Sequence, residues 1–374
     1  MYLVALKMLT GDRIKFITLV IGLTLSVLLI TQQGSIFWGI MSRFFTTINN
    51  AQADIWVMDP TTEQVDSPSP MDNTVLPRVE SVPGVAWAKP YRLGTGNARL
   101  RSGISRAVQL IGVDSDSLVG LPQNVIAGSI AELNTPDAVV VDKNELKKLG
   151  DPGIGDTFEI NDQRAKVVAI INTNRNFLSL PLIYTTYDRA QSYTPVERKF
   201  LSYILVKPEP WISGPNLARR ITKLTGLGAY TEEEFKSRTL AWYLKNTGIP
   251  INFGITVTLG VIVGAAIAAQ TFYTFTLENL KHFATLKAMG LTNWMLTKMV
   301  LFQSFLVGLI GYGNGLGLMA WFGSTVPKKT VLAFNTHPAL LLIAFVAVVF
   351  VCTISSLLSI QKIVRVEPAT VFRG

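Results

Sequence analysis

The side chains that could do chemistry are few in this sequence of 374 residues. It has two histidines, His282 and His337, and one cysteine, Cys352. The histidines are separated by a long uncharged segment that is expected to cross a membrane, so they cannot share a metal ion. The sequence has no G-x-x-x-x-G-K-[ST], H-E-x-x-H or G-x-S-x-G motif, so neither a phosphate cradle, a zinc site nor a nucleophile elbow is indicated. We therefore predict no catalytic, cofactor-binding or metal-binding residues in this chain.

Four long segments contain no Asp, Glu, Lys or Arg. A helix needs about 20 apolar residues to cross a bilayer, and all four are long enough. They predict an α-helical membrane protein with four transmembrane helices, one plus three, and a mixed α+β domain inserted between the first and second. The expected order is an interfacial helix and first span (1–43), the inserted domain (44–245), the second span (246–277), a loop (278–298), the third span (299–327), the fourth span (338–361) and a tail (362–374).

The net charge of +9 is unevenly distributed. Residues 44–245 hold 22 basic and 22 acidic residues, so the surplus flanks the spans. With alternating spans, most of the flanking basic residues fall on one side: Lys7, Arg13, Lys15, Lys281, Lys287, Lys298, Lys362, Arg365 and Arg373. Lys and Arg near membrane ends mark the cytoplasmic face. We expect cytoplasmic termini, a cytoplasmic 278–298 loop, residues 44–245 outside, and no nucleic-acid binding.

The inserted domain alternates between β-rich and helical segments. Runs rich in Val and Ile between turn residues predict strands at 54–58, 105–113, 137–142, 164–172 and 202–208. Residues 216–226 have helical periodicity and end in glycine, and a short helix is expected before Pro83-Gly84. A β-rich block of about 110–200 lies between strands near each end, which suggests a nested arrangement.

Small residues recur at intervals of four in the predicted spans, a spacing that lets helix backbones approach closely in lipid. They are Gly260, Gly264 and Ala268 in the second span and Gly311, Gly313, Gly315 and Gly317 in the third. Two interpretations stay open: packing within the chain, or contact with a second copy. No ionisable residue lies in mid-span, which argues against proton-coupled transport by this chain alone.

The charged loop at 278–298 separates the second span from the third. We expect the second span to continue as a helix to Gly290, which suits the left-handed position at a helix end, with Thr292 capping the next helix. One face of this helix carries Leu280, Phe283, Leu286 and Gly290. On the residues alone it is either a solvated hairpin whose apolar face lies on the membrane interface, or a helix whose apolar Phe283 side enters a partner's groove.

Resemblance to a known family favours the second interpretation. The segment FATLKAMGLTNWMLTKMVLFQSFLVGLIGYGNGLGL resembles the signature of FtsX-like permeases, the family that includes MacB and the lipoprotein-releasing LolC and LolE. The N-terminal YLVALKMLTGDRIKFITLVIGLTLSV, the phrases VESVPGV, QLIGVDSD and GIGDTFEINDQRAKVVAII, and the closing VRVEPATVFRG are also similar to this family.

The resemblance implies the permease half of a mechanotransmitting ABC transporter in the bacterial inner membrane. Its partners would be a cytoplasmic ATPase, a second permease copy and, in the periplasm, a membrane-fusion adaptor with an outer-membrane channel. MacB carries its ATPase on the same chain, whereas a separate subunit holding ATP and Mg is expected here, as in DevC-like or Lol-type systems. The implied domain has a porter-like part (about 44–110 and 200–245) and an inserted β-rich part (about 110–200).

The family's coupling helix, which seats in the ATPase, maps onto Glu278, Lys281, Phe283, Leu286, Lys287, Ala288, Met289 and Gly290. Its ATPase-proximal tail maps onto Pro368, Ala369 and Arg373. The implied function is export of a lipid, peptide or drug-like substrate, without catalysis by this chain. The alternative is FtsX-like signalling, in which the outer domain activates a periplasmic hydrolase and nothing is transported.

Overall fold

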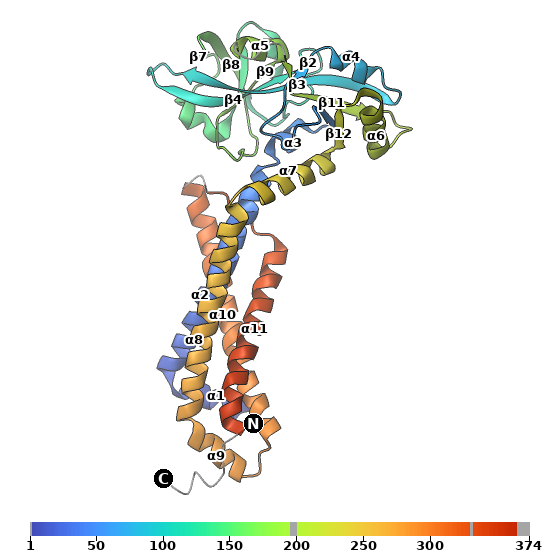
Figure 1. The fold of residues 1–374 in the computed structure, drawn as a ribbon. Coiled ribbons are helices and arrows are strands. Elements are labelled where there is room, and N and C mark those ends of the chain that lie inside the picture. The colour runs from blue at the N-terminus through green and yellow to red at the C-terminus, as the bar shows by residue number, and fades with distance from the viewer. Residues whose placement is uncertain (1, 195–199, 330–331, 365–374) are drawn as a thin grey trace. The chain divides into compact units, whose positions relative to one another are not determined.

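The computed structural model describes residues 2–194, 200–329 and 332–364. The chain forms two compact units. The bundle unit holds the residues up to Ile40 and those from Gly248 onward, and the sheet unit holds Met41–Thr247. Figure 1 labels the elements of both.

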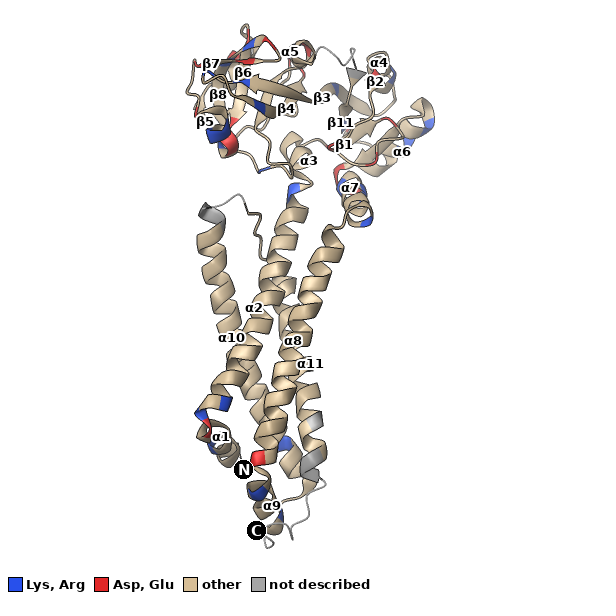
Figure 2. Ribbon diagram, turned by 60° about the vertical axis from the view of Figure 1, so that its left-hand side comes forward, with Lys and Arg blue, Asp and Glu red and all other residues tan. Residues whose placement is uncertain are grey.

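The bundle unit is made of helices: α1 (Tyr2–Gly11), α2 (Arg13–Arg43, which runs on into the sheet unit), α8 (Ile249–Glu278), α9 (Leu280–Ala288), α10 (Asn293–Lys329) and α11 (Pro338–Val364). Four of them are long and apolar enough to cross a membrane: Arg13–Arg43, Ile249–Glu278, Asn293–Val326 and Pro338–Gln361. In Figure 2 the middle of each of these helices is free of blue and red segments, because its side chains are uncharged. The predicted membrane fold, one span plus three, is confirmed.

A common apolar core joins the helices of the bundle unit. Leu19, Leu23 and Val27 of α2 pack with Ala268 and Phe272 of α8. Val307 of α10, with Val348, Val351 and Cys352 of α11, completes the cluster. The short α1 joins through Leu9, which is 1% exposed. All five helices therefore share one interior.

The sheet unit is built on a ten-stranded sheet in the order β12-β1-β11-β3-β4-β9-β6-β8-β5, with β7 paired to β3 and β8. A separate pair joins β10 and β2. The strands are β1 (Ile55–Met58), β2 (Met71–Asp72), β3 (Val85–Arg99), β4 (Ser105–Val113), β5 (Val125–Gly128), β6 (Ala138–Asp142), β7 (Thr157–Ile160), β8 (Gln163–Ile171), β9 (Leu182–Thr186), β10 (Phe200–Leu201), β11 (Tyr203–Pro208) and β12 (Gly228–Thr231). The five strands predicted from the sequence are confirmed as β1, β4, β6, β8 and β11.

Strands from both ends of the segment, β1, β3, β11 and β12, are neighbours at one end of this sheet. Strands from its middle, β4 to β9, form the other end. The chain leaves the first group at the long antiparallel β3–β4 pair, which runs from Tyr91↔Val113 to Arg99↔Ser105, and returns to it at β11. One continuous sheet therefore spans the stretch that the sequence divided into two parts.

Helices cover both faces of the first strand group (Figure 1). They are α3 (Thr46–Ala51), α4 (Val75–Glu80), α6 (Gly214–Thr225) and α7 (Glu232–Asn246), while α5 (Tyr187–Tyr193) lies over β3 and β4. Alternation along β1 explains the arrangement, because successive side chains of a strand point to opposite faces. Trp56 and Met58 belong to the core under α3 and α7, and Ile55 and Val57 to the core under α4 and α6.

Candidate functional site: the surface around α9

The helix expected at 278–290 is interrupted in the structure. α8 ends at Glu278, and Asn279, with φ −90° and ψ 7°, separates it from α9. The Asn279 side-chain Nδ2 donates to Phe275 O at 2.9 Å, and the Phe283 N–H donates to Asn279 O at 3.0 Å. The expectation of one uninterrupted helix is therefore wrong, because the helix breaks at Asn279. This residue hydrogen-bonds to the last turn of α8 and to the first turn of α9.

The turn after α9 has the predicted chemistry. Gly290 adopts φ +96°, a conformation that glycine reaches without steric cost. Thr292 then caps α10, because its Oγ1 accepts a bond from the Met295 N–H at 3.3 Å. The two predictions made for Gly290 and Thr292 are confirmed.

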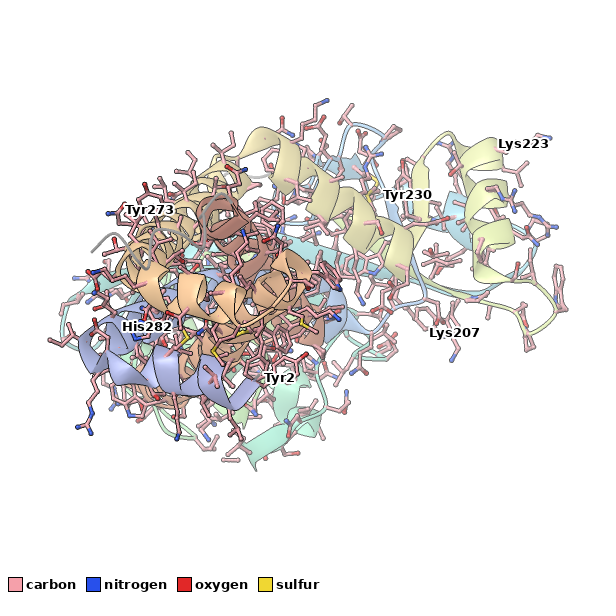
Figure 3. The ribbon with its side chains drawn as sticks, turned by 90° about the horizontal axis from the view of Figure 1, so that it is seen from below. Tyr2, Lys207, Lys223, Tyr230, Tyr273 and His282 are labelled. Carbon is pink, nitrogen blue, oxygen red and sulfur yellow. The ribbon has the colours of Figure 1, made fainter. Side chains whose placement is uncertain are left out.

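Phe283 does not lie on an exposed surface. Its side chain is 0% exposed and packs with Ala5 of α1, Leu296, Met299 and Val300 of α10 and Ile360 of α11. The break at Asn279 lets α9 lie against these helices, and Figure 3 shows α9, marked by His282, beside α1 with Tyr2. The expectation that Phe283 projects toward a partner is therefore wrong, and this ring anchors α9 to its own bundle.

Other apolar side chains are exposed around the turn. Met289 is 73% exposed, Trp294 63% and Met295 45%. Lys298 Nζ lies 5.2 Å from the centre of the Trp294 ring. Polar and small side chains on the same segment are also exposed: Lys281, His282, Thr285 and Ala288. We call these seven residues and Lys298 the α9 surface. Of the other coupling residues predicted, Leu286 and Lys287 are half-buried.

Glu278, also predicted to belong to the coupling segment, forms an ion pair with Lys15. Lys15 Nζ also lies 2.9 Å from Asp12 Oδ2, and its backbone N–H donates to Asp12 Oδ1. The hydrogen bond from Lys15 lowers the pKa of the Asp12 carboxyl below its usual value. These contacts fix the end of α8 to the start of α2. The predicted tail residues Pro368, Ala369 and Arg373 lie outside the described residues.

The six glycines predicted for helix packing or dimer contact fall into two groups. A Cβ at Gly260 or Gly264 of α8 would meet Leu29 or Ser26 of α2, and the Ser26 Oγ donates to Gly260 O at 3.0 Å. A Cβ at Gly311 or Gly315 of α10 would meet Leu23 or Val27 of α2 at 2.7 and 2.6 Å. A Cβ at Gly313 or Gly317 would meet nothing within 4 Å. Four glycines therefore serve packing within the chain, and two face away from it.

At its other end, α8 is joined to α7 by Thr247 and Gly248 alone. α7 begins with a capping box, in which Thr231 Oγ1 accepts from the Glu234 N–H and Glu234 Oε2 accepts from the Thr231 N–H. Near its end, the Tyr243 ring stacks on Phe44, with centroids 3.6 Å apart and planes at 2°. Phe44 directly follows α2. The segments that follow α2 and precede α8 are thus in contact inside the sheet unit. The sequence analysis missed α7, although T-x-x-E at 231–234 is a capping-box pattern.

Comparison with known proteins agrees with these elements. The MacB-like periplasmic core domain family matches residues 16–224, and the FtsX-like permease C-terminal family matches residues 254–368. A protein of Mycobacterium bovis named as an uncharacterized ABC transporter permease is 24% identical over 312 residues, which cover 82% of this chain and 80% of that protein. Another, of Mycobacterium tuberculosis, is 23% identical over 309 residues with the same coverage, 82% and 80%.

Solved structures of related domains are similar to part of the chain. The periplasmic region of MacB from Actinobacillus actinomycetemcomitans aligns with 54% of this chain and 96% of its own, at 14% identity and a TM-score of 0.38. The extracellular domain of the ABC-type transporter YknZ from Gram-positive bacteria aligns with 48% of this chain and 98% of its own, at 15% identity and a TM-score of 0.35. Because the MacB-like family alone matches more than half of the residues, this chain belongs to the MacB/FtsX family of ABC transporter permeases.

Proposed function

We propose that this chain is the permease subunit of a MacB-type ABC exporter. A separate cytoplasmic ATPase would bind the α9 surface, and its ATP-driven closure would move α8. The sheet unit, outside the membrane, would respond by moving a lipid, peptide or drug-like cargo toward an adaptor and an outer-membrane channel. This chain would transmit force and would not itself hydrolyse ATP.

One observation carries this proposal: the exposed α9 surface lies at one end of α8, and only two residues join the other end of α8 to α7. A displacement of α9 would therefore reach α7 through one helix, α8, and this two-residue connection. Buried Phe283 supports this role, because it fixes α9 to α1, α10 and α11 instead of leaving it free to bend. Exposed Met and Trp side chains beside lysines are typical of a helix that enters an apolar groove.

We also propose that two copies pair in the membrane. Of the six glycines considered for helix packing, Gly313 and Gly317 have open space beside them, and Asn314 between them is exposed. An amide that faces lipid has no water to bond with, so contact with a second copy would satisfy it. The oligomeric state of a Gly317→Leu variant, described in the Discussion, tests this pairing.

The coupling is tested with two tryptophans of the same helix. Trp294 and Trp321 of α10 are 63% and 65% exposed, but only Trp294 belongs to the α9 surface. With a cognate ATPase subunit co-expressed, we expect Trp294→Ala to weaken its binding about tenfold, as removal of a buried interface aromatic does. Trp321→Ala should leave binding and ATP hydrolysis unchanged. Equal binding by both variants would contradict the proposed binding of the ATPase at Trp294.

FtsX-like signalling is the second candidate function, favoured by the match of the FtsX-like family to residues 254–368. Both candidates need the ATPase, so Trp294→Ala does not separate them. Mass spectrometry of the purified complex does: a bound cargo supports export. Activation of a cell-wall hydrolase by the sheet unit, with no bound cargo, supports signalling.

A further inference from the structure

The sheet unit contains a cavity of about 530 Å³ that none of the roles above uses. Its walls come from β3, β4 and β10, from Ser202 and from the loops at 59–70 and 172–181. The lining side chains include Asp66, Arg92, Gln109, Leu178, Leu180 and Leu201. The volume lies within the range of about 300–1,000 Å³ that is usual for small-molecule sites.

One wall of the cavity is a network of buried polar side chains. Tyr243 Oη donates to Asp66 Oδ2 at 2.9 Å, and Gln109 lines the same cavity. Asn176 Nδ2 donates to Gln109 Oε1, and Asn176 Oδ1 accepts from the Leu180 N–H at 3.0 Å. Gln109 and Asn176 are each 3% exposed. Such a network holds its members in fixed positions, because each buried amide needs its partners.

Asp66 supplies the acidic group of this network. Burial raises the pKa of Asp66, and neither Lys nor Arg pairs with it in the part of the chain that the structure describes. Arg92 lines the cavity too, but its Nη2 donates to Thr194 Oγ1 at 2.7 Å, at the end of α5. The Asp66 side chain is half-buried, so water solvates its carboxylate only in part. It can accept more bonds than the one that Tyr243 supplies.

Four leucines, Leu93, Leu178, Leu180 and Leu201, form an apolar part of the lining. Leu93 and Leu201 are 7% and 1% exposed, whereas Leu178 is 55% exposed. Leu178 and Leu180 flank the Ser179 of a loop that Asn176 fixes through the Leu180 N–H. An apolar surface of this kind gains free energy when it is covered, at about 25 cal/mol per Å².

We propose that this cavity binds a small amphipathic amine, with its ammonium group at Asp66 and its apolar body against the leucines. The ammonium would supply a cation for this carboxylate. Because Asp66 is bonded to Tyr243 of α7, and Phe177 beside Leu178 lies 4.6 Å from the Phe44 ring centre, the occupied site would contact both segments that lead to the membrane helices. If the proposed export function holds, this is a site for cargo; the binding itself does not require it.

The test uses the full chain in lipid nanodiscs without ATPase, and two matched probes, 4-phenylbutylamine and 4-phenylbutan-1-ol. Titration calorimetry should show the amine binding about tenfold more tightly at pH 7, as expected of a charge-assisted bond. Asp66→Asn, which keeps an acceptor for Tyr243, should remove this difference. Asp162→Asn, at an exposed carboxylate outside the cavity, should keep it.

A second variant, Leu178→Asn, keeps the test decisive if Asp66→Asn does not fold. Leu178→Asn changes an exposed side chain, and it should weaken both probes about equally, by roughly fivefold. Equal affinities of the two probes for the unaltered chain, or the same loss in Asp162→Asn as in Asp66→Asn, would overturn the proposal. If the amine-binding test fails but Trp294→Ala weakens ATPase binding as expected, the proposed ligand site is rejected and the proposed function still stands.

Discussion

The bundle unit and the sheet unit differ in the hydrogen bonds that their polar side chains make within each unit. In the bundle unit, many hydroxyls bond to carbonyls of their own helix, as Thr31 does to Val27 O at 2.7 Å and Ser356 to Cys352 O at 2.6 Å. In the sheet unit, polar side chains bridge distant elements. Arg189 alone donates to Leu133 O, Thr135 O and Ala138 O, at 2.8 to 3.0 Å.

The difference follows from the solvent that each unit is expected to meet. In lipid, a hydroxyl that bonds within its own helix is satisfied without a neighbour, so helix contacts are set by shape and by glycine. In water, an aromatic core and directional bonds hold the sheet. The bundle unit should therefore be sensitive to added atoms, and the sheet unit to removed ones.

The largest effect is expected from removing a ring in the sheet unit. Trp56 is 0% exposed, and the rings of Tyr91, Tyr203 and Phe235 lie 5.2 to 5.6 Å from it. Trp56→Ala should cost about 3–5 kcal/mol of unfolding free energy. A thermal melt followed by circular dichroism should move down by about 10 °C. Trp211→Ala, at a 65% exposed side chain, is the control, and an equal shift in it would contradict the comparison.

The next effect comes from adding atoms to the bundle unit. A Cβ at Gly315 would lie 2.6 Å from Val27, whereas one at Gly317, two residues on, meets open space. Gly315→Leu should destabilise the detergent-solubilised chain by about 1–3 kcal/mol. Gly317→Leu has the same gain in helix propensity and should not be destabilised.

The same Gly317→Leu variant also tests whether this face of α10 pairs with a second copy. If this face meets a second copy, native mass spectrometry should find dimers of the unaltered chain and monomers of the variant. Dimers of unchanged abundance in Gly317→Leu would place the second copy elsewhere. Equal destabilisation by both leucines would remove the distinction between the two groups of glycines.

The smallest effect concerns the helix that leads to the membrane. Thr231→Ala removes the side-chain acceptor of the α7 capping box and should cost about 1 kcal/mol locally. Hydrogen exchange of the first-turn amides of α7 should accelerate about fivefold. Ser213, at the start of α6, caps nothing with its side chain, so Ser213→Ala should not change exchange there. Similar acceleration in both helices would show that the capping box is not the cause.

Much of the fold could be predicted because its signals are local. The strand at 105–113 and the glycine after the helix at 216–226 appear where the sequence indicated, and Gly226 has φ 77°. Uncharged length alone identified the membrane helices. α7 had a local signal too, its capping box, which the sequence analysis overlooked.

The remainder depends on contacts between residues far apart in the sequence. The break at Asn279 was not predicted, because the apolar helix pattern continues past it through Leu280, Phe283 and Leu286. Asp66 lies in a Pro/Ser-rich loop, and its partner Tyr243 is 177 residues away. No periodicity connects them, so the cavity they border could not be predicted.

The burial of Phe283 has a mechanical consequence. If α9 were attached only at its two ends, a small displacement would bend it and would not be passed on to other helices. Because Phe283 shares an apolar cluster with side chains of α1, α10 and α11, α9 is held between its ends as well as at them. If α9 receives the push of an ATPase, as proposed, shortening Phe283 to alanine should weaken this attachment while leaving the exposed side chains of the α9 surface unchanged.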